Sequence, residues 1–245
     1  MPTTNPSIEP LGLDGLLVRF SLRVTDQASA AVQAFAGALD AAPIAGVVDV
    51  VPALASVLVR FDQDRTTRAA VAGALADITA ARDWSQVIQP TPRRIWRIPV
   101  ALGGTHGPEL AEAAALAGLR EDEAIAQITA ADLRVLAIGF APGQPYLGLL
   151  PATWDMPRKS SLTSRVPAGA LVVAVRQVVL FANPSPTGWR QIGYTPFRPF
   201  DQNRADPAPL RAGDGLRLVA VSAVEIDALD RAGDRLGGAR CEVRP

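Results

Sequence analysis

Apolar residues in the first third of the chain alternate between strand-like and helix-like spacings. Continuous apolar runs predict strands at 16–20, 47–51 and 56–61. Between them, apolar residues at i, i+3, i+4 and i+7 place one buried face on a helix over 26–41 (Val32, Phe35, Ala36 and Leu39). A second helix follows the last of these strands, marked by Val71, Leu75 and Ile78. The order strand, helix, strand, strand, helix is typical of a layered α+β domain.

Two short sequences occur twice in this region. Leu-Val-Arg-Phe occupies 17–20 and 58–61, and Ala-Ala-Val occupies 30–32 and 69–71. The repeats come at matching places in two strand–helix units. We therefore expect residues 1–90 to form a split βαβ, ferredoxin-like domain.

From residue 91 the apolar runs become shorter, and glycine and proline separate them. The runs predict strands at 94–100, 133–140, 171–175, 178–182 and 216–221, with helices after Pro108, at 121–130 and at 224–231. Many short strands with turn signals between them indicate a closed or nearly closed β-barrel. The predicted fold class is α+β, with a ferredoxin-like domain over 1–90 and a barrel domain over 91–245.

Charge and cysteine content exclude several classes of protein. Residues 1–90 hold six arginines and nine acids, a formal −3, and the remainder holds eighteen basic and fifteen acidic residues, a formal +3. Neither part is basic enough for a nucleic-acid interface.

The single cysteine, Cys241, excludes an intramolecular disulfide. No apolar run reaches the roughly 20 residues of a membrane span, and the first residues do not resemble a signal peptide. We expect a cytoplasmic protein that binds neither nucleic acid nor membrane.

The segment 156–200 contains no acidic residue, but it contains Arg158, Lys159, Arg165, Arg176, Arg190 and Arg198. Such a segment should focus positive potential on any cleft that it lines. Arg158 and Arg165 flank a polar turn, where arginine suits a carboxylate, although a solvated surface position is the alternative. Tyr146 and Trp189 lie among turn residues, where they either line an apolar pocket or pack beneath loops.

His106, the only histidine, lies in a glycine-rich turn before a predicted helix. This position suits an anion or a carbonyl group, and it equally suits a structural hydrogen bond within the turn. No nucleophile elbow, metal-ligand spacing or phosphate-binding loop accompanies it. We therefore expect no metal site in this chain.

Several motifs together resemble the family of 5-oxoprolinase B subunits, also called KipI-like or allophanate hydrolase subunit 1. In chain order they are Gly-Gly…Gly-Pro-Glu-Leu (103–110), Gly-Phe-Ala-Pro-Gly…Pro-Tyr-Leu-Gly (139–148), Pro-Arg (157–158), Val-Pro-Ala-Gly (166–169) and Ser-Pro…Gly-Trp…Ile-Gly…Thr-Pro (185–196). The resemblance implies a ferredoxin-like domain followed by a cyclophilin-like barrel.

The resemblance also implies one component of a heteromeric, ATP-dependent enzyme that opens 5-oxoproline to glutamate, a component that is inactive alone. The implied partners are a KipA-like C subunit, which carries a carboxyltransferase domain, and a third, LamB/YcsF-like subunit. The implied ligand is a small carboxylate-bearing amide or lactam, and no cofactor is expected on this chain alone. One alternative is a KipI-like protein that inhibits a histidine kinase. Another is a degenerate structural subunit with a different ligand, of the urea or allophanate type.

The resemblance places the site in the barrel loops. It implies that His106 or Gln177 polarises a carbonyl and that Arg158 binds a carboxylate. The further substrate-binding residues that it implies are Phe140, Pro142, Gly143, Tyr146, Arg165, Ser185 and Trp189. The sequence departs from the family pattern at Thr105, Gln144, Thr163, Val178, Val179 and Tyr194. These departures remove mostly charged and polar groups, which indicates a different or less charged ligand.

Overall fold

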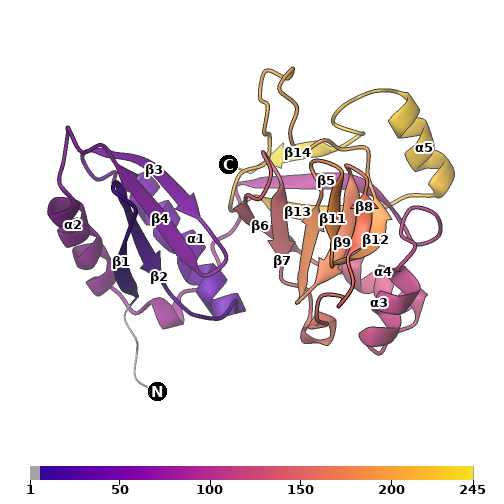
Figure 1. Ribbon diagram of the computed structural model, residues 1–245, viewed down its shortest axis with the longest axis horizontal. Coiled ribbons are helices and arrows are strands. Elements are labelled where there is room, and N and C mark those ends of the chain that lie inside the picture. The colour runs from indigo at the N-terminus through magenta and orange to yellow at the C-terminus, as the bar shows by residue number, and fades with distance from the viewer. Residues whose placement is uncertain (1–5, 245) are drawn as a thin grey trace. The chain divides into compact units, whose positions relative to one another are not determined.

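The structure, a computed structural model, describes residues 6–244 and divides after Thr91 into two compact units (Figure 1). The elements of the first unit are β1 (Ser7–Leu11), β2 (Gly15–Arg19), α1 (Asp26–Ala41), β3 (Val47–Pro52), β4 (Ser56–Phe61), α2 (Arg68–Ala80) and the 3-10 turn η1 (Trp84–Gln86). The helices begin where hydroxyl caps satisfy first-turn N–H groups: Thr25 accepts from Ala28, and Thr67 from Ala70.

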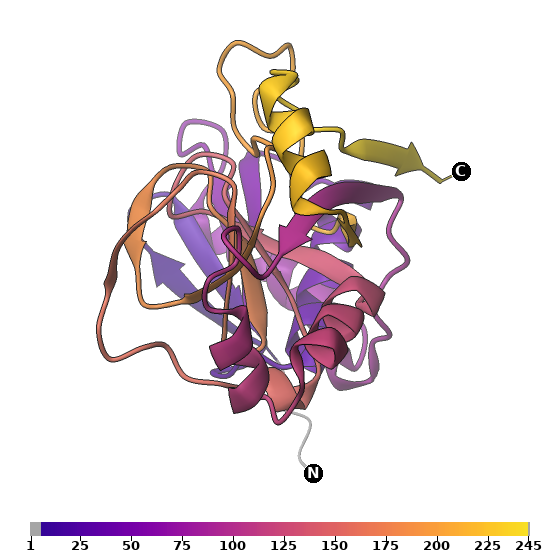
Figure 2. The ribbon, with the colours of Figure 1, turned by 90° about the vertical axis from the view of Figure 1, so that its right-hand side faces the viewer.

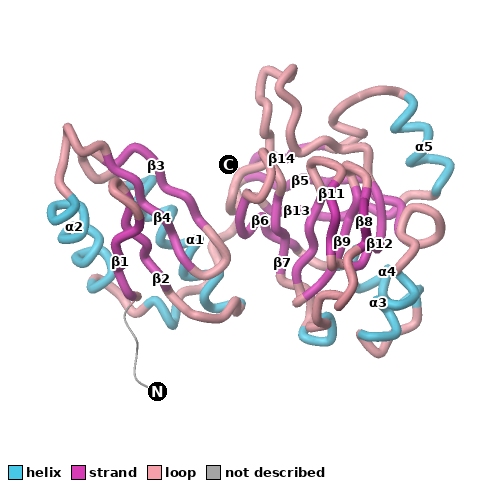
Figure 3. Tube along the Cα trace, viewed as in Figure 1, coloured by secondary structure: helices cyan, strands magenta, loops and turns pink. Residues whose placement is uncertain are grey.

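The strands of the first unit form an antiparallel sheet in the order β1–β2–β4–β3. Because β2 and β3 each pair antiparallel with β4, they are parallel to one another, and α1 connects them. Figure 3 distinguishes the helices and strands of this unit by colour. Residues of both helices share one core with the strands, and Phe35 packs edge-on against Trp84 at 5.3 Å between ring centres. The strand beside β2 is β1, which precedes the βαβ unit rather than following α2. The ferredoxin-like assignment of this unit stays a prediction.

The second unit has more and shorter strands. Its elements are β5 (Arg94–Leu102), α3 (Leu110–Leu116), α4 (Glu121–Ala130), β6 (Leu133–Ile138), β7 (Pro145–Gly148), η2 (Ala152–Trp154), β8 (Thr163–Val166), β9 (Ala170–Ala174), β10 (Gln177–Leu180), β11 (Ser185–Thr187), β12 (Arg190–Tyr194), β13 (Gly215–Ala220), α5 (Ala223–Arg231) and β14 (Arg240–Val243). Figure 2 shows α5 at one end of this unit and α3 with α4 at the other.

Within the described residues of this unit, seven strands close into a barrel in the order β12–β9–β10–β7–β6–β13–β5, and β12 pairs with β5 to complete the ring. This confirms the predicted barrel and the mixed α+β class. The length of β5 makes closure possible, because its first half pairs with β14 and its last residues pair with β12.

The strands β9 and β10 are buried on both faces. Val178 and Leu180 point into the barrel core, whereas Val179 packs in a second apolar cluster with Phe181 and Trp189. A separate two-stranded ribbon, β8 with β11, contributes Val166 to this outer cluster. The ribbon thus forms a second layer outside the barrel, and a cavity lies between the two.

Candidate functional site

A cavity of about 260 Å³ lies between the outer face of β7 and β10 and the ribbon with the loop that precedes it. Tyr146, Val179, Phe181 and Trp189 form an apolar part of its wall, beside polar and charged lining residues. Alternation along β10 explains this wall, because the residues that do not enter the barrel core must face the ribbon. The cavity is therefore an apolar slot outside the barrel, not a channel through it.

Arg158 and Trp189 form the charged edge of the cavity. The guanidinium carbon lies 5.3 Å from the centre of the Trp189 ring, within the range of a cation–π contact. Tyr146 meets the same ring edge-on, at 6.4 Å between ring centres. Arg158 forms no ion pair with a carboxylate among residues 6–244. Its positive charge is therefore uncompensated where the apolar slot meets solvent.

Lys159 lines the cavity beside Arg158, and it is paired. Its Nζ donates to Glu109 Oε1 and to Thr163 Oγ1. The other carboxylate oxygen, Glu109 Oε2, accepts from the backbone N–H of Gln191 at 2.6 Å. The carboxylate thus ties the start of α3, the strand β12 and the cavity loop together. Lys159 and Glu109 are together neutral, which distinguishes this corner from the Arg158 edge.

Two large apolar side chains flank the cavity at the surface. Phe140 is 76% exposed and Leu162 is 71% exposed. Phe140 also has a backbone φ of +71°, which is strained for an aromatic residue. Such strain persists only where the surrounding structure holds it, and it clusters at binding sites.

Four of the sequence-predicted site residues line the cavity: Phe140, Tyr146, Arg158 and Trp189. Ser185 lies on β11 next to the lining residue Pro186. Pro142 and Gly143 belong to the adjoining 139–144 turn and do not line it. At Gly143, with φ +69°, an added Cβ would lie 2.5 Å from the carbonyl oxygen of Pro199, so the need for glycine there is structural.

The other three predicted site residues lie elsewhere. Arg165 is exposed on β8. Gln177 is buried on β10 near Gly148, and its Oε1 has no hydrogen-bond partner among the described residues. His106 Nε2 lies 3.0 Å from Asp227 Oδ1 on α5. The structure therefore does not bring His106 or Gln177 to the cavity that Arg158 lines.

His106 belongs to a polar cluster between the 103–107 turn and α5. Its ring lies 5.8 Å from that of Tyr194, whose hydroxyl donates to Asp230 Oδ2 at 2.9 Å. Burial raises the pKa of the Tyr194 phenol, while the positive charge of the neighbouring Arg198 opposes the rise. At neutral pH the phenol is a neutral donor, and the cluster fastens α5 to the barrel.

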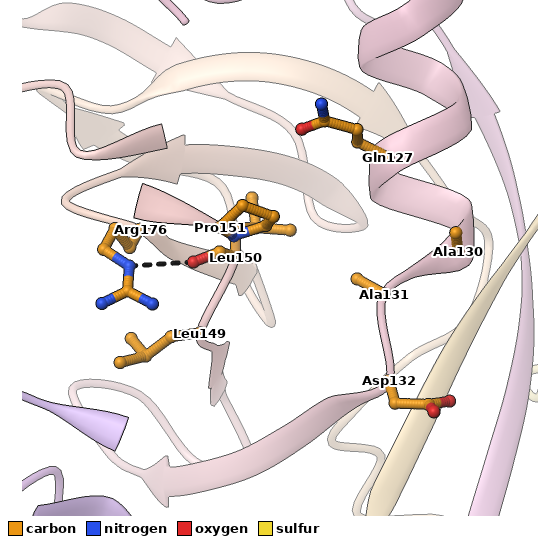
Figure 4. A pocket seen from close by; sticks show the side chains of 8 residues that line it. All are labelled: Gln127, Ala130, Ala131, Asp132, Leu149, Leu150, Pro151 and Arg176. Carbon is orange, nitrogen blue, oxygen red and sulfur yellow. Dashed lines mark hydrogen bonds between the residues drawn. The ribbon is translucent and has the colours of Figure 1, made fainter. Parts of the chain in front are cut away.

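A second hollow, of about 410 Å³, lies between the end of α4 and the segment after β7 (Figure 4). Most of its polar groups already bind other parts of the protein. Arg176 Nε donates to the carbonyl of Leu150 at 2.9 Å, Gln127 Oε1 accepts from Trp154 at 3.0 Å, and Asp132 Oδ1 accepts from Arg217 at 2.7 Å. The first cavity, with an uncompensated charge and aromatic walls, is the stronger candidate.

Sequence reasoning missed several cavity residues. Val179 and Phe181 were recognisable as strand residues, but the strand is apolar on both faces, so its outer face could not be told from its inner one. Lys159 carried a clearer signal, since it is the only lysine and lies in the acid-free segment. Its partner Glu109 is 50 residues away in sequence, and only folding brings the two together.

Neither a metal cluster nor a membrane-spanning helix occurs in the described part of the chain. In residues 6–244, no three His, Cys, Asp or Glu side chains gather closely enough to hold a metal ion. In the same range no helix is long and apolar enough to cross a bilayer.

Comparisons with known proteins identify the family. The sequence profile of the carboxyltransferase domain, subdomains C and D, matches residues 6–210. A Bacillus subtilis (strain 168) protein, by name the B subunit of 5-oxoprolinase, is 32% identical over 227 residues, which cover 90% of this chain and 95% of that protein. The chain belongs to the family of 5-oxoprolinase B subunits. An Escherichia coli O157:H7 protein of the same name is 38% identical over 135 residues, 55% of this chain and 62% of that protein.

Solved structures agree with the family assignment. PH0987 from Pyrococcus horikoshii, an uncharacterized protein, is 30% identical with a TM-score of 0.52, and the match covers 90% of this chain and all of that one. TTHA0988 is 32% identical with a TM-score of 0.67 over 85% of this chain, which spans 40% of the TTHA0988 chain. The Kluyveromyces lactis urea carboxylase shares the fold, with 14% identity and a TM-score of 0.72. That match covers 97% of this chain and 24% of the urea carboxylase chain.

Three departures from the family pattern lie at or beside the cavity. Gln144 and Val179 line it, and Thr163 accepts a hydrogen bond from Lys159. Gln144 is 1% exposed, and its Oε1 accepts from the backbone N–H of Ala182 at 3.2 Å. Gln144 and Val179 are therefore part of the cavity lining, and Thr163 holds the lysine beside them.

Proposed function

We propose that this chain is the B subunit of a 5-oxoprolinase-like complex and that its cavity binds a small carboxylate-bearing lactam. The extensive similarity to a protein named as a 5-oxoprolinase B subunit supports the first part. The observation that carries the second part is Arg158, an unpaired cation held against Trp189 at the edge of an apolar slot. A carboxylate would pair with the guanidinium while the ring of the ligand packed against Tyr146 and Trp189.

The size of the cavity supports a ligand of this kind. A volume of about 260 Å³ is slightly below the range of about 300–1,000 Å³ typical of sites for drug-sized molecules. A five-membered lactam with one carboxylate needs little space, one cation and an apolar wall. The cavity offers all three.

In this proposal the complex opens 5-oxoproline to glutamate at the expense of ATP, and this chain is inactive alone. A KipA-like C subunit and a third, LamB/YcsF-like subunit supply the remaining parts, including the ATP site. The sequence contains no phosphate-binding loop of the Gly-x-x-x-x-Gly-Lys-Ser/Thr type, which agrees with ATP binding by another subunit.

Co-expression with the two partner subunits tests the proposal. We expect a stable complex that forms glutamate from 5-oxoproline only when ATP is present, and no turnover by this chain alone. Arg158→Met should lower turnover. Arg165→Met should leave it unchanged, because Arg165 is exposed on β8 and does not line the cavity. An assembled complex with all subunits and no 5-oxoproline turnover would refute the assignment.

A regulatory function is a second candidate, supported by the exposed pair Phe140 and Leu162. Exposed apolar side chains flanking a cavity are typical of contact surfaces for another protein. A KipI-like inhibitor of a histidine kinase would lose inhibition on Phe140→Ser with Leu162→Ser and retain it on Arg158→Met. The opposite result would favour the lactam-binding function.

The finer fold assignments belong to the same proposal. We infer that the first unit is a ferredoxin-like variant in which β1, rather than a strand after α2, occupies the edge beside β2. We further infer that the barrel is of the cyclophilin-like type. The strand order β1–β2–β4–β3 and the closed ring support these inferences.

A further inference from the structure

The position and the ion pair of Lys159 are not explained by packing alone. It is the only lysine among 245 residues, and it lines the cavity. Its side chain is 14% exposed and that of its partner Glu109 is 20% exposed, so the ion pair is largely removed from water. Desolvating such a pair is costly, and a hydrophobic pair of similar volume is often at least as stabilising. A functional role accounts for its presence at a ligand cavity.

The Lys159 ammonium has one N–H donor that bonds to no described residue. A lysine ammonium has three N–H donors. Glu109 Oε1 and Thr163 Oγ1 accept from the Lys159 Nζ. Among the described residues no further acceptor bonds to it. Since Lys159 lines the cavity, the third proton is available to an oxygen atom of a ligand.

The two cations of the cavity differ in whether a carboxylate of the protein balances their charge. Arg158 has no carboxylate partner among the described residues, so a ligand carboxylate would neutralise it. The charge of Lys159 is already balanced by Glu109, which is itself held by the Gln191 N–H at 2.6 Å. A second carboxylate at Lys159 would lie close to that of Glu109 and be repelled. A neutral carbonyl oxygen would accept the third proton without this penalty.

We propose that Lys159 is a ligand-binding residue that donates a hydrogen bond to the neutral amide carbonyl of the lactam, with Glu109 and Thr163 as positioning residues. The inference rests on the proposed lactam-binding function and adds the group that recognises the carbonyl. It divides the cavity into a carboxylate subsite at Arg158 and a carbonyl subsite at Lys159.

Three probes separate the subsites: 5-oxoproline, which has both groups, 2-pyrrolidinone, which lacks the carboxylate, and cyclopentanecarboxylate, which lacks the lactam. Binding to the full chain is measured by ligand-observed NMR. In addition, protein labelled with 15N-lysine gives a single backbone amide signal from Lys159, which reports on occupancy of this corner. We expect both lactams to shift this signal.

Lys159→Met should weaken 5-oxoproline and 2-pyrrolidinone about tenfold, the effect of one charged hydrogen bond, and should leave cyclopentanecarboxylate unchanged. Arg158→Met should weaken the two carboxylates and leave 2-pyrrolidinone unchanged. Because Lys159→Met leaves Glu109 unpaired, the double variant Lys159→Met with Glu109→Gln repeats the test without a lone charge. Lys159→Arg, which keeps the charge but not the compact ammonium, should also weaken the lactams.

Equal affinity losses for all three probes would overturn the inference, because they would show a general effect on the cavity. Unchanged lactam affinity in the Lys159 variants would overturn it as well. If 5-oxoproline binds the natural protein, Arg158→Met weakens it and the Lys159 variants do not, then the Lys159 inference fails and the proposed lactam site stands. If none of the three probes binds, the proposed lactam site fails with it.

Discussion

The guanidinium of Arg158 lies over the ring of Trp189, 5.3 Å from its centre, at the edge of an apolar cavity. The two residues are far apart in the chain, and hydrogen bonding fixes their proximity: the N–H of Lys159 donates to the carbonyl of Gly188 at 2.7 Å. An arginine stacked on an indole keeps its N–H donors at the ring edge free for a planar anion. This relationship is the basis of the first prediction.

Arg158→Met should weaken binding of 5-oxoproline to the cavity by about 10- to 100-fold, because a charge-assisted hydrogen bond to the carboxylate is lost. The stem of methionine retains apolar contact with Trp189, so the thermal midpoint should change little. Calorimetry or NMR titration measures the affinity. Arg165→Met is the matched control and should have no effect; an equal loss in both variants would show nonspecific attraction by positive charge.

Gly143→Ala should destabilise the barrel unit more than Gly104→Ala does. Both glycines have positive φ, +69° and +54°, so alanine is strained at either by about 1–2 kcal/mol. At Gly104 an added Cβ meets nothing within 4 Å, whereas at Gly143 it lies 2.5 Å from the Pro199 oxygen. We expect a further loss of about 1–3 kcal/mol at Gly143, as for other overpacked sites. Urea unfolding measures both, and equal losses would contradict the steric explanation.

Gln177→Met should keep or raise stability, by up to about 1 kcal/mol, because the buried Oε1 that it removes has no partner among residues 6–244. Gln144→Met is the matched comparison. Its Oε1 accepts from the Ala182 N–H, so its loss should cost about 1–3 kcal/mol. Ligand affinity should be unchanged in the Gln177 variant. A large loss of affinity there would mean that Gln177 reaches the ligand, as the family resemblance implies.

Asp214 should make the stability of the barrel unit depend on pH. Burial raises its pKa above the ordinary 3.8, and hydrogen bonds from the Arg211 N–H and from Trp96 Nε1, together with the charge of Arg94, oppose the rise. A raised folded-state pKa means that the folded protein holds the proton more tightly than the unfolded chain. The resulting stabilisation is present below pH 3.8 and is lost as pH rises through the raised pKa.

Asp214→Asn removes this titration. As pH rises from about 3 to 7, the natural protein should lose stability relative to the Asn variant, and the difference should level off once Asp214 is fully ionised. Urea unfolding followed by tryptophan fluorescence measures the free energy of unfolding at each pH. A difference that moves in the opposite direction would show that the hydrogen bonds outweigh burial.

Local sequence was sufficient for most of the secondary structure. The helix predicted over 26–41 has the same bounds in the structure, and so does that over 121–130. Their apolar periodicity and end residues lie within one segment, so no distant contact is needed to define them. Short strands such as β7, β8 and β11 escaped prediction, because three or four residues between turns carry too little periodicity.

The α+β class and the barrel follow from the hydrophobic pattern, and the family follows from the ordered motifs. Which candidate residues share a cavity depends on the three-dimensional fold. It brought Arg158 and Trp189 together, placed Lys159 against Glu109, and left His106 with Asp227 on α5. The physical reason is that periodicity records which residues are buried, whereas the pairing of side chains distant in sequence follows from ring closure and from the ribbon folded over β9 and β10.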